Sequence, residues 1–164
     1  GLFGPCGYGL PAIIGAKIGC PDTPVVGFAG DGAFGIAVTE LTAIGRSEWP
    51  PITMIVFRNY QWGAEKRNST LWYDDNFVGT ELDTQVSYAG IANACGLQGV
   101  QAHTMEELRD ALNTAITDQM KNGKTTLIEA LINQELGEPF RRDAMKKPVA
   151  VAGISASDMR VQQA

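Results

Sequence analysis

Apolar runs along this chain alternate with segments in which apolar residues recur at helical spacing. The runs at 24–29, 52–57 and 125–132 have the length of buried strands, and a fourth, short strand is expected near 98–102. Helices are expected between them, over about 11–19, 34–46, 84–95 and the residues after Thr104. This alternation predicts an α/β fold, with a mostly parallel sheet and helices on both faces.

Two segments interrupt the pattern. Residues 1–9 are a glycine-rich loop, and residues 58–82 are long, polar and aromatic, as expected of a functional loop. One domain is predicted over residues 1–136, followed by a C-terminal tail over 137–164. The chain starts at Gly1 inside a glycine-rich stretch and without an initiator Met, so an upstream part is expected to be absent.

Composition narrows the function classes. The 13 Lys and Arg against 18 Asp and Glu give a net charge of −5, which argues against a nucleic-acid partner. Three cysteines and one histidine, with no CxxC pair, argue against a disulfide framework or a zinc site. Neither a signal peptide nor a membrane-spanning run is found, so a cytoplasmic protein without a membrane partner is predicted.

Polar residues follow two of the predicted strands directly. Asp31 comes after the first strand and Asn59 after the second, so both are expected at the edge of the sheet where ligands bind. The literal GxGxxG match over residues 30–35 suggests a dinucleotide site, and Arg58 would suit NADP. Against this, Asp31 would face a pyrophosphate with like charge, and the acid that would hold a ribose is missing.

A bound metal removes that objection. Magnesium prefers hard oxygen ligands and often binds a carboxylate together with phosphate oxygens. Asp31 would supply the carboxylate, and the Asn59 side chain and a nearby backbone carbonyl would supply further oxygens. Gly32 would let the backbone approach a diphosphate closely, and the helix that begins near Ala33 would offer free N–H groups.

The order of these blocks resembles the thiamine-diphosphate enzymes. In that family a Gly-Asp-Gly follows one strand and an Asn the next, a little over two dozen residues later; here residues 33–58 separate Gly32 from Asn59. Upstream, residues 4–12 (GPCGYGLPA) are similar to the GxxGxGLPA segment of the acetolactate-synthase-like branch. The resemblance implies thiamine diphosphate and Mg²⁺ as cofactors, bound by the domain at 1–136.

The resemblance also implies roles for individual residues. Asp31 and Asn59 would bind the magnesium ion through their side chains, and Gln61 through its backbone carbonyl. Gly32 and Ala33 would bind the diphosphate through their N–H groups.

Further cofactor contacts are implied on either side of these blocks. Gly4 would lie near the aminopyrimidine, and Cys6 occupies the position where relatives often carry a bulky apolar side chain that supports the bent cofactor. Trp62 and Gly63 would complete the cofactor-binding set.

Within the family, residues 58–82 and 137–149 resemble the sulfoacetaldehyde acetyltransferases. That branch converts sulfoacetaldehyde and phosphate, which are both anions, into acetyl phosphate and sulfite. The basic residues that are candidates for binding these anions are Arg58, Lys66, Arg67, Arg141, Arg142, Lys146 and Lys147. Acetolactate synthase, or a related pyruvate carboligase or decarboxylase, is the alternative within the family.

No catalytic residue is expected in this chain itself. The resemblance implies that the activating glutamate comes from a separate pyrimidine-binding domain of a neighbouring subunit. The complete enzyme would then be a homodimer or homotetramer, and this chain alone would be inactive. Outside the family, an NADP-binding oxidoreductase and a non-enzymatic module of the same fold stay open as alternatives.

Overall fold

The structure, a computed structural model, describes residues 4–46 and 48–135. These residues divide into two units, which are described separately. The first unit consists of the described residues up to 61 and from 81 to 134, and it contains the sheet. The second consists of residues 62–80 and Glu135, and it contains one helix.

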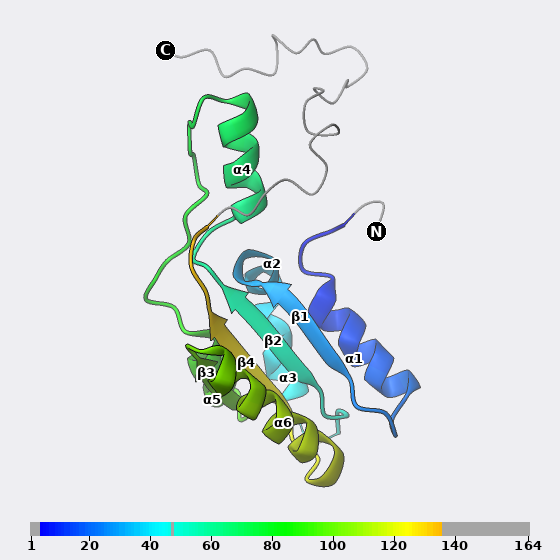
Figure 1. Ribbon diagram of the computed structural model, residues 1–164. Coiled ribbons are helices and arrows are strands. Elements are labelled where there is room, and N and C mark those ends of the chain that lie inside the picture. Colours follow the sequence, from blue (N-terminus) through cyan, green and yellow to red (C-terminus); the bar gives the residue numbers. More distant parts are fainter. Residues whose placement is uncertain (1–3, 47, 136–164) are drawn as a thin grey trace, which may run out of the picture. The chain divides into compact units, whose positions relative to one another are not determined.

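Four parallel strands form the sheet of the first unit (Figure 1). In chain order they are β1 (Val26–Gly30), β2 (Thr53–Arg58), β3 (Gln98–Ala102) and β4 (Thr126–Leu131). Their spatial order is β1-β2-β4-β3, so β3 and β4 are neighbours and β2 lies inside the sheet. All four predicted strands are confirmed, with ends shifted by at most two residues.

Helices connect the strands. They are α1 (Gly9–Gly19), α2 (Asp31–Ile36), the short 3-10 helix η1 (Val38–Glu40), α3 (Leu41–Ile44), α4 (Gly63–Trp72), α5 (Tyr88–Ala94) and α6 (Met105–Lys121). The single helix predicted over 34–46 is wrong, because α2, η1 and α3 occupy this segment and α2 starts at Asp31. The chain leaves the helical conformation at Ala37 (φ −107°, ψ 12°), just before the β-branched Val38 and Thr39, which are weak helix formers.

Helix α4 corrects a second prediction. Residues 58–82 were expected to be a loop throughout, but Gly63–Trp72 is helical. The residues at 64–67 (Ala-Glu-Lys-Arg) are among the strongest helix formers, which explains the helix. Within this second unit, the Lys66 ammonium lies 5.3 Å from the centre of the Phe77 ring, so the helix packs against the segment that follows it.

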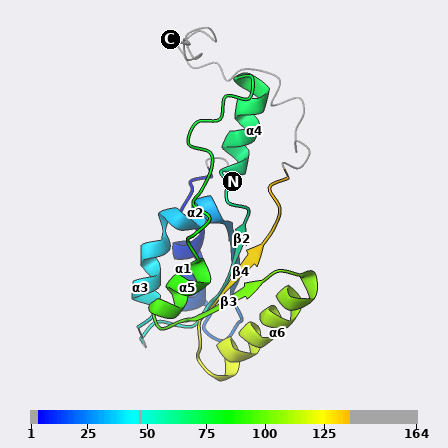
Figure 2. The same ribbon diagram turned by 90° about the vertical axis from the view of Figure 1, so that its left-hand side faces the viewer.

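The helices of the first unit cover both faces of the sheet (Figure 2), which confirms the predicted fold class. Helices α1, α2, α3 and α5 lie on one face, over a buried cluster that includes Phe34, Met54 and Leu127. Helix α6 covers the other face, over Ile55 and Ile128. No helix in the described part of the chain combines the length and the apolar character that a membrane crossing requires.

Close backbone contacts place α5 against its neighbours. A Cβ at Gly99 would overlap the carbonyl of Ala89, and a Cβ at Gly45 would overlap the carbonyl of Cys95. Only glycine therefore lets β3 and the end of α3 approach α5 this closely.

Helix α6 begins with a side-chain cap at Thr104. The Thr104 Oγ1 accepts a hydrogen bond from the N–H of Glu107 at 3.1 Å, and the Glu107 carboxylate accepts one from the N–H of His103 at 2.7 Å. The first bond satisfies a donor that the first turn of a helix leaves unpaired, and the second engages the N–H of the residue before the cap.

Candidate functional site

The carboxyl ends of β1 and β2 form the candidate site. The register pairs Gly30 with Phe57, so Asp31 and Arg58 follow at the same edge of the sheet. Gly30 has extended backbone (φ −71°, ψ 157°), and Asp31 is the first residue of α2. The chain thus turns from strand to helix at Asp31, at the edge where parallel α/β sheets bind their ligands.

The Asp31 carboxylate is buried, with only 1% of the residue exposed. Its Oδ2 accepts a hydrogen bond from the N–H of Tyr60 at 2.7 Å, and its Oδ1 accepts one from the N–H of Gly32 at 3.0 Å. Burial raises the pKa of Asp31 above its ordinary 3.8, and these hydrogen bonds and the charge of Arg58 offset only part of the rise. A cation at this carboxylate would stabilise its ionised form.

The hydrogen bond from Tyr60 holds the turn at residues 59–61 against Asp31. Tyr60 has a φ of 61°, in the left-handed region that aromatic residues seldom occupy. The Asn59 Oδ1 accepts a long hydrogen bond from the N–H of Gln61 at 3.3 Å. The structure therefore brings together Asp31, Asn59 and Gln61, the three residues predicted to bind the metal.

The backbone carbonyl and the side chain of Gln61 are engaged differently. Gln61 forms an isolated antiparallel bridge with Glu81, and the hydrogen bonds of this bridge use the backbone groups of the neighbouring residues. The Gln61 carbonyl takes no part in that pairing, whereas the side-chain Nε2 donates to the carbonyl of Gln134 at 2.9 Å. The side-chain Oε1 is buried and has no hydrogen-bond partner among the described residues, so Gln61 presents two oxygens, the backbone carbonyl and Oε1, that a metal could engage.

These oxygen atoms match the chemistry that magnesium requires. A carboxylate, a side-chain amide and a peptide carbonyl are hard ligands, and phosphate oxygens of a cofactor complete such a set. Among the described residues, no group of three or more His, Cys, Asp or Glu side chains could hold a metal ion. Metal binding here would depend on neutral oxygens beside Asp31.

Gly32 and Ala33, the predicted diphosphate contacts, lie in the first turn of α2. Gly32 is buried and Ala33 is partly exposed. The first-turn N–H groups of a helix have no partner within the helix, although that of Gly32 is already bonded to Asp31.

The other predicted cofactor contacts lie in two places. Gly4 and Cys6 are exposed, in the segment that precedes α1, and Gly4 has a positive φ of 63°. Trp62 and Gly63 belong to the second unit, where Trp62 directly precedes α4 and Gly63 begins it.

Arg58 was proposed as an anion-binding residue, and the structure corrects this. Arg58 is 2% exposed, and its Nε lies 3.2 Å from Oε1 of Glu129, whose carboxylate is fully buried. The guanidinium is therefore paired in the interior and unavailable to a substrate. Glu129 interrupts the apolar run at 125–132, which is a sequence sign of a buried charge but does not identify its partner.

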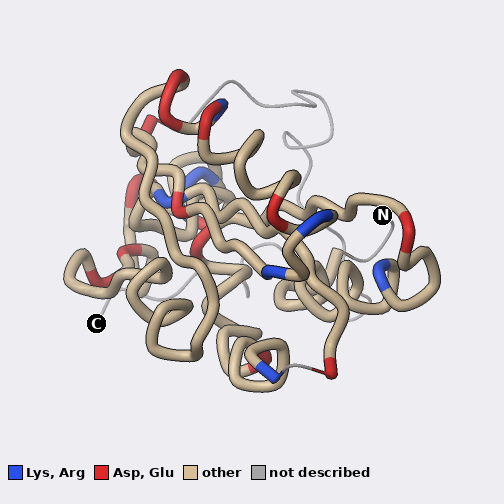
Figure 3. The backbone as a smooth tube through the Cα atoms, turned by 90° about the horizontal axis from the view of Figure 1, so that it is seen from below, with Lys and Arg blue, Asp and Glu red and all other residues tan. Residues whose placement is uncertain are grey.

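The remaining basic candidates occupy other segments. Lys66 and Arg67 lie on α4, whereas Arg141, Arg142, Lys146 and Lys147 lie outside the described residues. Over the described backbone, Lys and Arg are spread across several elements among Asp and Glu (Figure 3).

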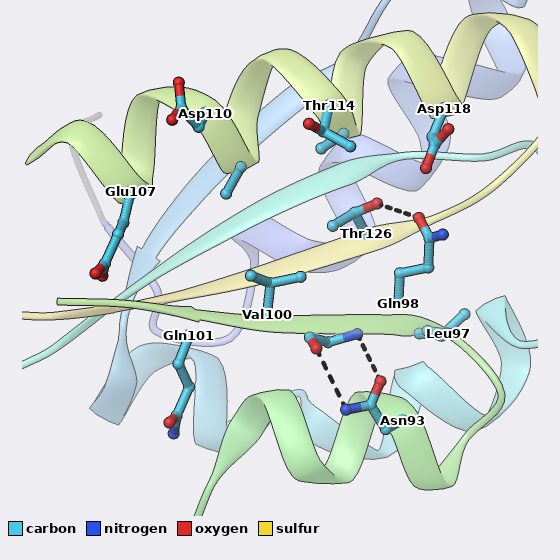
Figure 4. A pocket seen from close by; sticks show the side chains of 13 residues that line it. Asn93, Leu97, Gln98, Val100, Gln101, Glu107, Asp110, Thr114, Asp118 and Thr126 are labelled. Atoms are coloured by element: carbon cyan, nitrogen blue, oxygen red, sulfur yellow. Dashed lines mark hydrogen bonds between the residues drawn. The ribbon is translucent and has the colours of Figure 1, made fainter. Parts of the chain in front are cut away.

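An open groove of about 610 Å³ lies between α6 and the edge strand β3 (Figure 4). Its lining includes Glu107, Asp110 and Asp118, and their negative charges disfavour a diphosphate or a sulfonate. Beside the groove, the Asn93 side chain accepts a hydrogen bond from the N–H of Gly99 and donates one to its C=O. These two bonds pair backbone groups that the edge strand β3 would otherwise leave open. The groove is therefore a poorer candidate for the cofactor site than the Asp31 edge.

The parallel sheet carries, at one carboxyl edge, a buried carboxylate, the start of a helix and the turn at residues 59–61. This arrangement is typical of an α/β domain that binds a cofactor. The chain belongs to the family described as "Thiamine pyrophosphate enzyme, C-terminal TPP binding domain", which matches residues 1–130. This match confirms the predicted family and its cofactor, thiamine diphosphate, in place of the dinucleotide alternative.

Two relatives cover nearly the whole chain. The sulfoacetaldehyde acetyltransferase of Roseovarius nubinhibens is 83% identical over 163 residues, and that of Rhodobacter capsulatus is 84% identical over 162 residues. Each alignment covers 99% of this chain and 27% of the relative, so the chain spans about a quarter of the length of these relatives. Among solved structures, the thiamine diphosphate-dependent 4-hydroxybenzoylformate decarboxylase of Rhodococcus jostii RHA1 is similar, with a TM-score of 0.68 and 27% identity; the match covers 80% of this chain and 24% of that one.

Proposed function

We propose that this chain is the cofactor-binding part of a thiamine-diphosphate-dependent sulfoacetaldehyde acetyltransferase. The complete enzyme would convert sulfoacetaldehyde and phosphate into acetyl phosphate and sulfite. The observation that carries the proposal is the 83% identity, over 99% of this chain, to a relative that bears this name.

The residues at the Asp31 edge support a role in binding Mg²⁺ and the diphosphate. The Asp31 and Asn59 side chains and the Gln61 carbonyl would hold the ion, and the N–H groups of Gly32 and Ala33 would bind the diphosphate. When bound, thiamine diphosphate would supply the nucleophilic carbon that this chemistry requires. The role of this chain would be to bind the cofactor and fix its orientation.

The complete enzyme would use groups that this chain does not supply. We expect the activating glutamate to come from a pyrimidine-binding domain of a neighbouring subunit, so that the enzyme works as a homo-oligomer and this chain alone is inactive. Large apolar side chains at the surface support such contacts: Tyr8 is 66% exposed, Phe28 65% and Ile36 58%. Exposed apolar side chains of this size favour burial against other protein surfaces.

The reaction can be tested on the complete polypeptide by measuring sulfite release from sulfoacetaldehyde. We expect release to require phosphate, Mg²⁺ and thiamine diphosphate together, with acetyl phosphate as the second product. Release of carbon dioxide from pyruvate without any sulfite would instead assign the enzyme to the acetolactate-synthase side of the family.

The metal site can be tested separately with Asp31→Ala. This variant should lose Mg²⁺-dependent binding of thiamine diphosphate in calorimetric titration, because the only carboxylate proposed to bind the ion is gone. Asp22→Ala is the matched control, since Asp22 is an exposed aspartate beyond the end of α1. Unchanged cofactor affinity in Asp31→Ala would refute the metal assignment.

A further inference from the structure

The guanidinium of Arg58 lies in a buried cage of protein groups. Besides the Nε contact to Glu129 at 3.2 Å, one terminal nitrogen donates to the carbonyl of Asp83 at 3.0 Å. Its central carbon lies 4.5 Å from the centre of the Tyr60 ring and 5.1 Å from that of Tyr88. A planar cation can contact two aromatic rings and a carboxylate at once, which a lysine ammonium cannot do in the same way.

Glu129 is itself held in place by other elements. Its Oε2 accepts hydrogen bonds from Ser87 Oγ at 2.9 Å, Gln101 Nε2 at 3.0 Å and the N–H of Ala89 at 3.1 Å. These donors come from the start of α5 and from β3, while Glu129 lies in β4. Its position, and with it that of Arg58, is therefore fixed by three elements of the core.

Both tyrosines whose rings contact Arg58 are also hydrogen-bonded to Asp31. The Tyr88 hydroxyl donates to the backbone carbonyl of Asp31 at 3.1 Å, and the N–H of Tyr60 donates to the Asp31 Oδ2 at 2.7 Å. A chain of contacts therefore runs from Glu129 through Arg58 to the proposed metal ligand.

The turn at Tyr60 requires such support. A left-handed conformation at a residue other than glycine is strained and persists only where the surroundings enforce it. Here the Tyr60 N–H is bonded to Asp31, its carbonyl accepts from Leu82 at 2.8 Å, and its ring contacts Arg58. Asn59 and Gln61, on either side, take their orientation from this residue.

We propose that Arg58 and Glu129 are positioning residues that set the Asn59–Gln61 turn for metal binding by holding Tyr60 and Tyr88 against Asp31. Neither residue would touch the ion or the substrate. The inference rests on the proposed Mg²⁺ and diphosphate site. It adds the buried Arg58–Glu129 ion pair to the residues on which that site depends.

The test is the Mg²⁺ dependence of thiamine diphosphate binding, measured by calorimetric titration of the complete polypeptide. In the double variant R58M/E129M, both charges go while the side-chain volume is largely kept. The variant also leaves the donors of Ser87, Gln101 and Ala89 without their acceptor, so its thermal midpoint should fall below that of the wild type. Measured at a temperature where the variant is folded, the Mg²⁺ concentration for half-maximal binding should be about 10- to 100-fold higher than in the wild type, as for other residues that orient metal ligands.

The matched control is R46M/E48M. It removes an Arg–Glu pair of similar length, 3.3 Å, that is 64% and 67% exposed, so its Mg²⁺ dependence should equal that of the wild type. If R58M/E129M does not fold, Arg58→Lys decides, because it keeps the charge and loses the planar contacts; we expect at least a several-fold rise in the Mg²⁺ requirement.

Two results would overturn the inference: the first leaves the proposed function valid, and the second does not. If the wild type binds thiamine diphosphate with Mg²⁺ and the Arg58 variants need no more Mg²⁺ than it does, only the positioning role is wrong. If the wild type shows no Mg²⁺-dependent binding, the proposed function fails as well.

Discussion

Replacing Glu129 by Gln tests whether the buried ion pair stabilises this fold. The new amide could still accept hydrogen bonds through its carbonyl oxygen, where Oε2 of Glu129 now accepts three. Its NH₂ group would face the Arg58 Nε, however, and leave a guanidinium that is 2% exposed without a counter-charge. Breaking a buried pair in this way costs roughly 3–5 kcal/mol. The 3.2 Å contact lacks the alignment of a hydrogen bond, so we expect the lower end, about 3 kcal/mol.

The effect should depend on pH. Burial raises the pKa of Glu129, but hydrogen bonds from Gln101, Ala89 and Ser87 outweigh burial and bring the pKa below its ordinary 4.5. A carboxyl whose pKa is lower in the folded state contributes stability that is fully present above its unfolded pKa and is lost as the pH falls through its folded pKa. The difference between wild type and variant should therefore be largest near neutral pH and shrink below pH 4.5.

Scanning calorimetry of the complete polypeptide without cofactor measures this directly. A loss of about 3 kcal/mol lowers the midpoint of a domain of this size by roughly 6–12 °C. Glu106→Gln removes an equal charge from an exposed position on α6 and should cost at most about 1 kcal/mol. A shift in Glu129→Gln no larger than in this control, or one that does not shrink as the pH is lowered progressively below 4.5, would refute the reasoning.

Two further tests, each with its own control variant, examine a close backbone contact and a helix cap by thermal unfolding. Gly99→Ala should destabilise the domain by about 1–3 kcal/mol, because its Cβ would overlap the carbonyl of Ala89 and push α5 away from β3. Gly15→Ala, inside α1 with open space around its Cβ, should instead stabilise by about 0.5–1 kcal/mol, and equal effects of the two would contradict the close-contact argument. Thr104→Ala should cost about 1 kcal/mol by removing the cap of α6, whereas Thr104→Ser should cost little.

Strands β2 and β4 could be predicted because they are buried on both faces, whereas β1 and β3 are only partly buried. Strands buried on both faces appear in the sequence as continuous apolar runs, which is how 52–57 and 125–132 were found. Helix α4 was missed because it contributes no buried residue to a core, so that it lacks an apolar stripe and only its helix-forming residues mark it. The break between α2 and α3 was missed because apolar spacing continues across it.

The residues of the candidate site that directly follow a strand were predictable from the sequence. Asp31 and Asn59 each follow a strand directly, and parallel strands end at one edge. The partner of Arg58 was not predictable, because it depends on the order of strands in the sheet. Glu129 pairs in register with Val56, two residues before Arg58, although β3 and three helices separate β2 from β4 in the sequence.

The charges at this edge connect the ion pair with the proposed metal site. Asp31, Arg58 and Glu129 are all at most 2% exposed, and together they carry two negative charges and one positive charge. Because Glu129 engages Arg58 at 3.2 Å, Asp31 keeps a negative charge that no side chain in the described part of the chain neutralises at contact distance, and burial raises its pKa. An Arg58 without Glu129 would be drawn towards Asp31 and would compete with a cation there. Glu129 would therefore preserve the unbalanced charge that suits Asp31 to the proposed role of metal ligand.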